Sequence, residues 1–165
     1  MHSSMRVKKA VTSSMPILIN PQMMRQVIMD HYEHPRNKRI PKDDRYLKIH
    51  MDSASCIDDI YVYLLVENGI IKDCSFDGVA CTISTASTSI MTELVMGKTL
   101  KDALYIIKQY TAMIHEEKYD DSVLDEAIVF MNTAKQAARI KCATIGWDGL
   151  EELIHESEGE KHDHR

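Results

Sequence analysis

Two alternating segments joined by Asn68-Gly69 constrain the fold of this chain more than any other feature of its sequence. In residues 60–67 and again in 70–77, side chains alternate with the period of two that is typical of β-strands. Asn-Gly favours the positive φ angles of a two-residue hairpin turn. The sequence therefore predicts an antiparallel hairpin, to which the earlier segment 46–51 can add a third strand.

Helical periodicity flanks the predicted sheet on both sides. Before it, one helix is expected from about Pro21 to His34, because the residue before a proline is pushed out of the α region. After Gly78, helices are expected at 83–94, at 99–114, from 122 onward, at 134–139 and at 143–155. We therefore predict an α+β fold, in which a three-stranded antiparallel sheet packs against an N-terminal helix and a helical C-terminal half.

The 165 residues are enough for one ordinary domain with its own hydrophobic core. Residues 1–20 have no clear period, and residues 156–165 are mostly charged. The predicted organisation is a flexible N-terminal extension (1–20), a single domain (21–155) and a charged C-terminal tail (156–165).

Charge and composition exclude several classes of protein. A net charge of -5 and a pI near 5.9 argue against general nucleic-acid binding, which needs a basic face. The sequence contains no apolar stretch long enough for a membrane span and no secretory h-region near the N-terminus. We therefore expect a cytoplasmic protein whose four cysteines are reduced thiols.

The cysteines occupy distinctive places relative to the predicted elements. Cys56 precedes the hairpin and Cys81 follows it, so antiparallel pairing should bring the two together, with Asp58 beside them. Cys81 and Cys142 are both expected at helix starts, where the helix dipole suits a thiolate. Cys74 lies on the core-facing side of its strand and is expected to be buried and inert.

Three thiolates and one carboxylate form a tetrahedral set that suits zinc, or one iron of an iron–sulfur unit. The cysteines include no C-x-x-C pair, and free cysteines are often small core residues. Local chemistry alone therefore leaves both interpretations open.

The chain resembles the SufU/IscU family, also described as NifU N-terminal-like, from about Met24 to Leu153. The resemblance is carried by VIMDHY at 27–32, PRNK at 35–38, Cys56-x-Asp58, F-x-G-x-x-C-x-IS-x-AS at 76–87, RIKCAT at 139–144 and Trp147. These motifs occur in the family's order. The resemblance implies a role in iron–sulfur cluster assembly.

Two features favour the SufU branch over the scaffold branch. Lys141 stands immediately before Cys142, where IscU-like proteins usually have histidine. The interval between Cys81 and Cys142 is also longer than in IscU-like proteins and contains an extra stretch that ends at 117–121. The chain is therefore most similar to the zinc-dependent SufU proteins.

This resemblance implies roles for individual residues and partners. The metal ligands would be Cys56, Asp58, Cys81 and Cys142, with zinc as the cofactor. Cys56 would also accept sulfur from a PLP-dependent cysteine desulfurase of the SufS type and pass it to a downstream iron–sulfur scaffold, and Arg139 would pair with a site residue or the partner. The alternatives are a scaffold that binds iron or a transient iron–sulfur cluster, and a degenerate zinc-binding interaction domain without sulfurtransferase activity.

One departure from the family pattern lies inside the site. Ile57 occupies the position between Cys56 and Asp58 that is normally glycine. A β-branched residue is strained where a turn needs positive φ, so the turn could shift and present Asp59 instead. The intact spacing favours Asp58 as the ligand.

For the other polar residues, the sequence predicts mainly surface, capping or packing roles. His31 and His34, near the end of the first helix, are expected at the surface or as helix caps without a metal. The basic loop 36–38 is expected to be solvated or, by the family resemblance, to contact a partner. The Ser/Thr run 82–89 is expected to let its helix lie close to the metal site.

Overall fold

The computed structural model describes residues 20–54 and 57–163, so the predicted ligand Cys56 and residues 1–19 lie outside the described ranges. The elements in chain order are α2 (Pro21–Glu33), β1 (Leu47–Asp52), β2 (Asp59–Glu67), β3 (Ile70–Val79), α3 (Thr82–Val95), α4 (Leu100–Ile114), the 3-10 helices η2 (Asp121–Val123), η3 (Asp125–Phe130) and η4 (Thr133–Lys135), and α5 (Ala137–Asp163). One antiparallel sheet with strand order β1-β2-β3 combines with these helices, which confirms the predicted α+β class.

The hairpin forms where its sequence predicts it. Asn68 and Gly69 have φ angles of 56° and 75°, as the two-residue turn requires. β2 and β3 then pair antiparallel, with Leu64 opposite Cys74 near the middle of the ladder. β1 pairs with the other edge of β2 and completes the predicted sheet.

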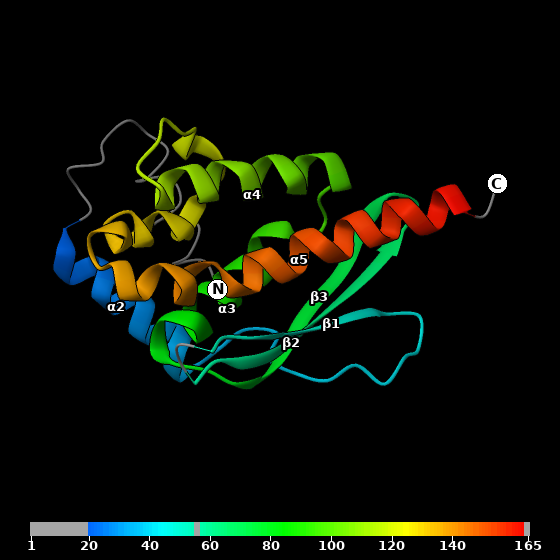
Figure 1. Ribbon diagram of the computed structural model, residues 1–165, viewed down its shortest axis with the longest axis horizontal. Helices are drawn as coiled ribbons and strands as arrows, with labels where there is room; N and C mark the ends of the chain where they lie inside the picture. Colours follow the sequence, from blue (N-terminus) through cyan, green and yellow to red (C-terminus); the bar gives the residue numbers. More distant parts are fainter. Residues whose placement is uncertain (1–19, 55–56, 164–165) are drawn as a thin grey trace.

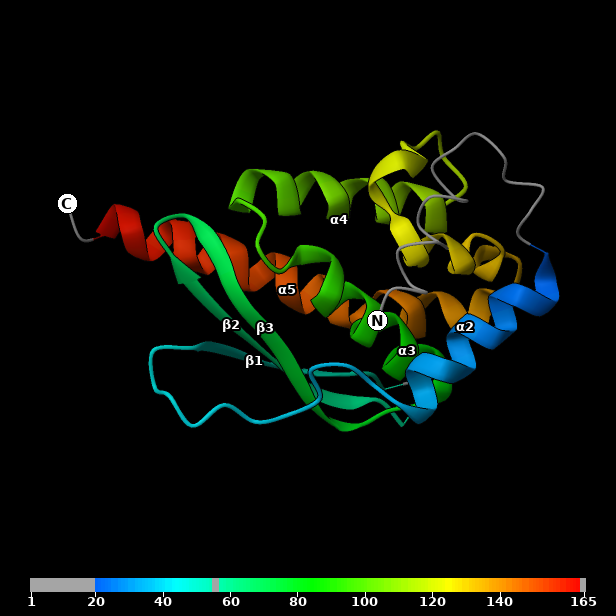
Figure 2. The same cartoon turned by 180° about the vertical axis from the view of Figure 1, so that it is seen from behind.

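The apolar face of the sheet is covered by two helices. Ile60, Val62 and Leu64 point to this face and are almost completely buried. α3 contacts β3, and α5 contacts both β1 and β2. In both views the helices α3 and α5 lie between the sheet and α4, so the core occupies two successive layers (Figures 1 and 2).

α2 lies where the sequence predicts the first helix, to within one residue at its end. The side chain of Asn20 accepts a hydrogen bond from the amide of Met23 at 2.8 Å and caps the helix, with Pro21 in the first turn. The helix ends at Glu33, two residues before Pro35. α2 packs against α3 and η3.

A buried polar and aromatic cluster ties α3, α4 and α5 together. Tyr110 stacks on Trp147 with 3.9 Å between ring centroids. The hydroxyls of Tyr110 and Ser87 both donate to the carbonyl of Ala143, at 2.8 and 2.7 Å, and the Trp147 indole donates to Ser87 at 2.9 Å. Burial raises the pKa of Tyr110, so its hydroxyl stays a donor. This cluster fixes one turn of α5 against the two other helices.

The segment between α4 and α5 corrects the sequence-based prediction. No α-helix starts at Ser122, and of the helix expected at 134–139 only residues 137–139 are α-helical, as the first residues of α5. Between α4 and α5 the described chain forms the three short 3-10 helices instead. Asp125 adopts a left-handed φ of 50°, which interrupts any continuous α-helix. Gln136 has φ -120° and ψ 85° and separates η4 from α5.

α5 is a single helix and is longer than predicted. It begins at Ala137, not Ala143, and continues beyond His155 to Asp163. Its glycines permit close packing, since a Cβ on Gly146 would lie 2.3 Å from Thr88 Oγ1 on α3. Within the described residues, no helix is both long and apolar enough to cross a membrane.

Candidate metal centre

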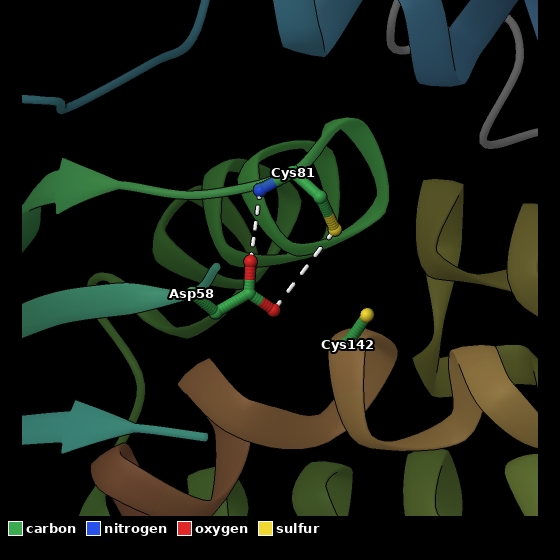
Figure 3. Close-up of side chains that lie close together, drawn as sticks. All are labelled: Asp58, Cys81 and Cys142. Atoms are coloured by element: carbon green, nitrogen blue, oxygen red, sulfur yellow. Dashed lines mark hydrogen bonds between the residues drawn. The ribbon is translucent and has the colours of Figure 1, made fainter. Parts of the chain in front are cut away.

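Three of the four predicted ligands converge at one end of the sheet. The ligand atoms of Asp58, Cys81 and Cys142 all lie within 4.8 Å of one another, a spacing from which a single ion could be bound (Figure 3). They come from three different places: the residue before β2, the residue before α3, and α5. Cys56, the fourth predicted ligand, lies outside the described residues.

Cys81 is held by the N-terminus of α3. It directly precedes that helix, as predicted, and is its N-cap residue. Its sulfur accepts the amide of Ser84 at 3.4 Å. Its own amide donates to Asp58 Oδ1 at 2.8 Å. The cap therefore fixes the direction of the sulfur relative to the carboxylate.

Asp58 is buried, with 2% of its surface exposed, and its two oxygens have different partners. Oδ1 accepts the Cys81 amide, while Oδ2 accepts the hydroxyl of Ser84 and lies 3.9 Å from the Cys81 sulfur (Figure 3). A buried carboxylate needs such donors because it loses its hydration on folding. These donors orient Asp58 toward the two sulfurs.

Asp59, the alternative ligand, lies elsewhere. Its side chain is exposed and pairs with Nε2 of His50 across the β1–β2 ladder. Successive residues of an extended chain point to opposite sides, so only one of the two aspartates can face the thiols. The geometry places Asp58 beside Cys81, with Ile57 exposed to solvent despite replacing the family glycine.

Cys142 occupies the second turn of α5, which corrects its predicted place at a helix start. The thiol is almost fully buried, and Figure 3 shows it directed toward Asp58 and Cys81. The next residue, Ala143, carries the carbonyl that Ser87 and Tyr110 bind. The packing of α5 on α3 and α4 therefore determines the position of the Cys142 sulfur, which does not lie at a helix start.

Arg139 lies one turn before Cys142 on α5, and its side chain is exposed. It borders a cavity of about 570 Å³ that opens beside the partly exposed Cys81. The cavity is lined by Tyr32, Ile57, Ala80, Cys81, Thr82, Ile83, Gln136 and Arg139. A reactant in this cavity would meet the Cys81 side of the centre next to the positive charge of Arg139.

Cys74 behaves as predicted. It is completely buried in the sheet, and burial raises the pKa of its thiol to about 12. It is not one of the three converging residues, and the raised pKa disfavours the thiolate form that reacts.

The loop at 36–38 is built into the fold. Arg36 donates its amide to Ser89 at 2.8 Å, and its guanidinium binds Asp30, whose pKa is lowered by that hydrogen bond. Asn37 adopts a φ of 59° and donates to Thr92 at 3.0 Å. The loop is thus fastened to α2 and α3; its predicted contact with a partner stays a prediction.

Sequence reasoning missed two polar residues. The sequence predicts only a small side chain at Ser84, yet its hydroxyl donates a hydrogen bond to Asp58. Its position three residues after the N-cap Cys81 is the sequence pattern that indicates a capping contact. His31 was expected at the surface or as a helix cap, yet it is completely buried. Its partners Ser89 and Glu126 are distant in sequence, so no local sequence pattern predicts that His31 is buried.

The chain matches a known protein family over most of its length. Residues 23–152 match the family described as the NifU-like N-terminal domain. The chain belongs to this family. The matched residues include all three of the converging ligands.

Two curated relatives cover most of the chain. It is 38% identical over 138 residues to the zinc-dependent sulfurtransferase SufU of Bacillus subtilis, covering 83% of this chain and 92% of that protein. It is 30% identical over 137 residues to the iron–sulfur cluster assembly scaffold protein IscU of Thermotoga maritima, covering 83% and 96%. The two branches considered from the sequence are thus both represented among its relatives.

A solved structure has the same fold. The crystal structure of a protein from Fervidobacterium islandicum, described as an iron–sulfur cluster assembly scaffold protein for the SUF system, superposes with a TM-score of 0.72. The two chains are 28% identical, and the match covers 84% of this chain and 98% of the other.

Proposed function

We propose that this protein is a zinc-dependent sulfur acceptor in iron–sulfur cluster assembly, a sulfurtransferase of the SufU type. The observation that carries the proposal is the convergence of Asp58, Cys81 and Cys142 in a chain that is similar to SufU over most of its length. The reduced thiols that this role needs fit a cytoplasmic protein.

The residues present fit zinc. Two thiols and one carboxylate are ligands that zinc commonly binds, and a tetrahedral site needs one more. Cys56, two positions before Asp58, is the proposed fourth ligand and would complete a three-thiolate, one-carboxylate set. When bound, zinc would keep the thiols deprotonated without adding redox chemistry of its own.

The proposed reaction is transfer of one sulfur atom. A PLP-dependent cysteine desulfurase of the SufS type would bring a cysteine persulfide, and the Cys56 thiolate would attack its outer sulfur. The sulfur–sulfur bond of the donor breaks, a new one forms on Cys56, and the donor cysteine leaves as a thiolate. Electrons balance without an oxidant, and the persulfide of Cys56 can pass to a downstream scaffold.

The residues around the cavity would guide this reaction. Arg139 borders the cavity beside Cys81, where its positive charge would attract an anionic persulfide. Asp58 and Cys81 are held by hydrogen bonds to the N-terminus of α3, so this part of the centre is preorganised. We therefore assign Arg139 to reception of the donor and Cys56 to nucleophilic attack.

The second candidate function is a scaffold for a transient iron–sulfur cluster. The same donor set can hold iron, and the Thermotoga relative carries a scaffold name. Lys141 favours the first candidate, because its exposed ammonium lies 3.9 Å from Asp148 and supplies no imidazole next to Cys142.

Metal analysis of the protein purified without a histidine tag separates the candidates. We expect about one zinc per chain and no visible cluster absorption. Cys81→Ser and Cys142→Ser should lose most of the zinc, whereas the matched control Cys74→Ala should keep it. An oxygen-sensitive chromophore with bound iron would favour the scaffold instead.

Single-turnover transfer tests the acceptor itself. A desulfurase loaded with labelled persulfide should pass label to the zinc-loaded wild-type protein but not to Cys56→Ala. Arg139→Gln should retain zinc and accept the label more slowly. Full transfer to Cys56→Ala would refute the acceptor role, and a zinc-loaded wild type that accepts no label would support the degenerate interaction domain.

A further inference from the structure

A second group of metal-ligating side chains lies apart from the thiol centre. His31 on α2, Glu93 on α3 and Glu126 on η3 offer ligand atoms that all lie within 4.8 Å of one another. None of these residues belongs to the proposed zinc site. The group joins two helices to the segment that precedes α5.

The histidine ring is held in a fixed orientation. His31 is completely buried, with Nδ1 2.8 Å from the hydroxyl of Ser89 and Nε2 2.9 Å from a carboxylate oxygen of Glu126. Ser89 is itself fixed, because the amide of Arg36 donates to its hydroxyl at 2.8 Å. Metal-binding histidines are typically oriented in this way, with the second ring nitrogen bonded to a neighbouring polar group.

The charges of the group favour a cation. Glu93 and Glu126 bring two carboxylates together, and among the side chains described, those of residues 20–54 and 57–159, no lysine or arginine lies within 4.0 Å of either carboxylate. Like charges at this separation repel, and an ion between them turns that repulsion into attraction. Glu93 is exposed and Glu126 is partly exposed, so an ion can enter from solvent and keep water ligands.

We propose that His31, Glu93 and Glu126 bind a divalent cation, for which Mn²⁺ is the probe. One imidazole nitrogen and two carboxylate oxygens suit Mn²⁺ or Fe²⁺ better than a thiolate-preferring ion. The ion would connect α2 and α3 to η3 and so stabilise the segment that leads into α5. The proposal concerns a different site from the sulfur acceptor and does not depend on its activity.

Manganese titration of the zinc-loaded protein tests the site. Zinc at the thiol centre leaves the second group available, and free Mn²⁺ is followed by its electron paramagnetic resonance signal. We expect one Mn²⁺ per wild-type chain and binding weakened about tenfold or more in Glu93→Gln. Glu152→Gln, which removes an exposed glutamate from α5, is the matched control and should bind like the wild type.

Thermal unfolding supplies an independent readout. Mn²⁺ should raise the melting temperature of the wild type and of Glu152→Gln but leave that of Glu93→Gln unchanged. If Glu93→Gln is already destabilised without metal, Glu126→Gln replaces it, since its amide oxygen can still accept from His31. Equal Mn²⁺ binding by the wild type and these variants, or no binding by the wild type, would overturn the proposal.

Discussion

The two sides of the candidate metal centre are built in different ways. On the sheet side, Asp58 and Cys81 are joined by a direct hydrogen bond, and Ser84 contacts both. On the helix side, Cys142 is positioned by α5. The carbonyl of the next residue, Ala143, accepts hydrogen bonds from Ser87 on α3 and Tyr110 on α4. The first side relies on local capping, and the second on the packing of three helices.

This difference has consequences for stability and function. A helix cap contributes about 1 kcal/mol and constrains mainly its own residues. A packed aromatic cluster contributes several times more and is shared by distant segments. We therefore expect the helix side to respond more strongly to core substitutions and the sheet side to backbone changes near β3.

The largest expected effect concerns the packing that carries Cys142. Trp147→Ala removes a fully buried indole that stacks on Tyr110, and it should lower the free energy of unfolding by about 3–5 kcal/mol. Urea unfolding followed by circular dichroism measures the change. Tyr105→Phe, which loses one exposed hydrogen bond, should stay within about 0.5 kcal/mol of the wild type. Similar small losses in both variants would show that the aromatic stack does not hold α5.

A backbone substitution tests the sheet side. Gly78 has a φ of +123°, and an added Cβ would lie 2.3 Å from the carbonyl oxygen of Asp59. Gly78→Ala should therefore cost about 2–3 kcal/mol and weaken zinc binding, because the β2–β3 pairing beside Asp58 must shift.

Gly97→Ala is the matched control for this change. Gly97 also has a positive φ, of +82°, but an added Cβ would meet nothing within 4 Å. Only the conformational penalty of about 1 kcal/mol should appear, with zinc content unchanged. If the two variants lose equal stability, close backbone contact at Gly78 does not matter.

The contact between α3 and α5 should show an intermediate effect. Gly146→Ala forces a methyl group against Thr88 and should cost about 2 kcal/mol. Thr88→Ala should recover part of this loss in the double variant, which a double-mutant cycle measures. Gly159→Ala on the same helix meets no neighbour and should be neutral or stabilising by up to about 1 kcal/mol. Purely additive effects of the two substitutions would contradict the contact.

The smallest expected effect depends on pH. Arg39 donates two hydrogen bonds to Asp73, at 2.8 and 2.7 Å, and these lower the pKa of the carboxyl group. A carboxyl group whose pKa is lower in the folded state stabilises the fold above its unfolded pKa and loses this contribution as pH falls through the folded value.

Asp73→Asn should thus cost about 1 kcal/mol at neutral pH, and the difference from the wild type should shrink as pH falls below the ordinary carboxyl value of 3.8. Unfolding free energies measured from pH 7 to pH 2.5 test this. Asp77→Asn, which loses only a 3.9 Å contact with Lys38, should change less. A pH-independent difference for Asp73→Asn would mean that the ion pair does not stabilise the fold.

Much of the sheet side could be predicted from sequence. The alternating strands, the Asn68-Gly69 turn and the burial of Cys74 follow from local period and turn chemistry, and all three agree with the structure. The position of Cys81 directly before a helix could also be predicted from the sequence. Asp58 and Cys81 are brought together by the hairpin between them, so their proximity could be inferred from the strand pairing.

The helix side could not be predicted in the same way. The helix expected to start at Ala143 begins at Ala137, and the segment before it forms 3-10 helices because Asp125 and Gln136 depart from α geometry. The burial of His31 against Glu126 likewise joins residues that are far apart in the chain. Local propensity is weak evidence wherever tertiary packing selects the conformation.

By itself, the sequence determined the hairpin, the capped start of α3 and the pairing of Asp58 with Cys81, because hydrogen bonds between near neighbours and strand partners encode them. Only the tertiary structure decided where Cys142 lies. Its position depends on how α5 packs against α3, α4 and the sheet, and that packing sums many contacts between residues that no sequence period relates.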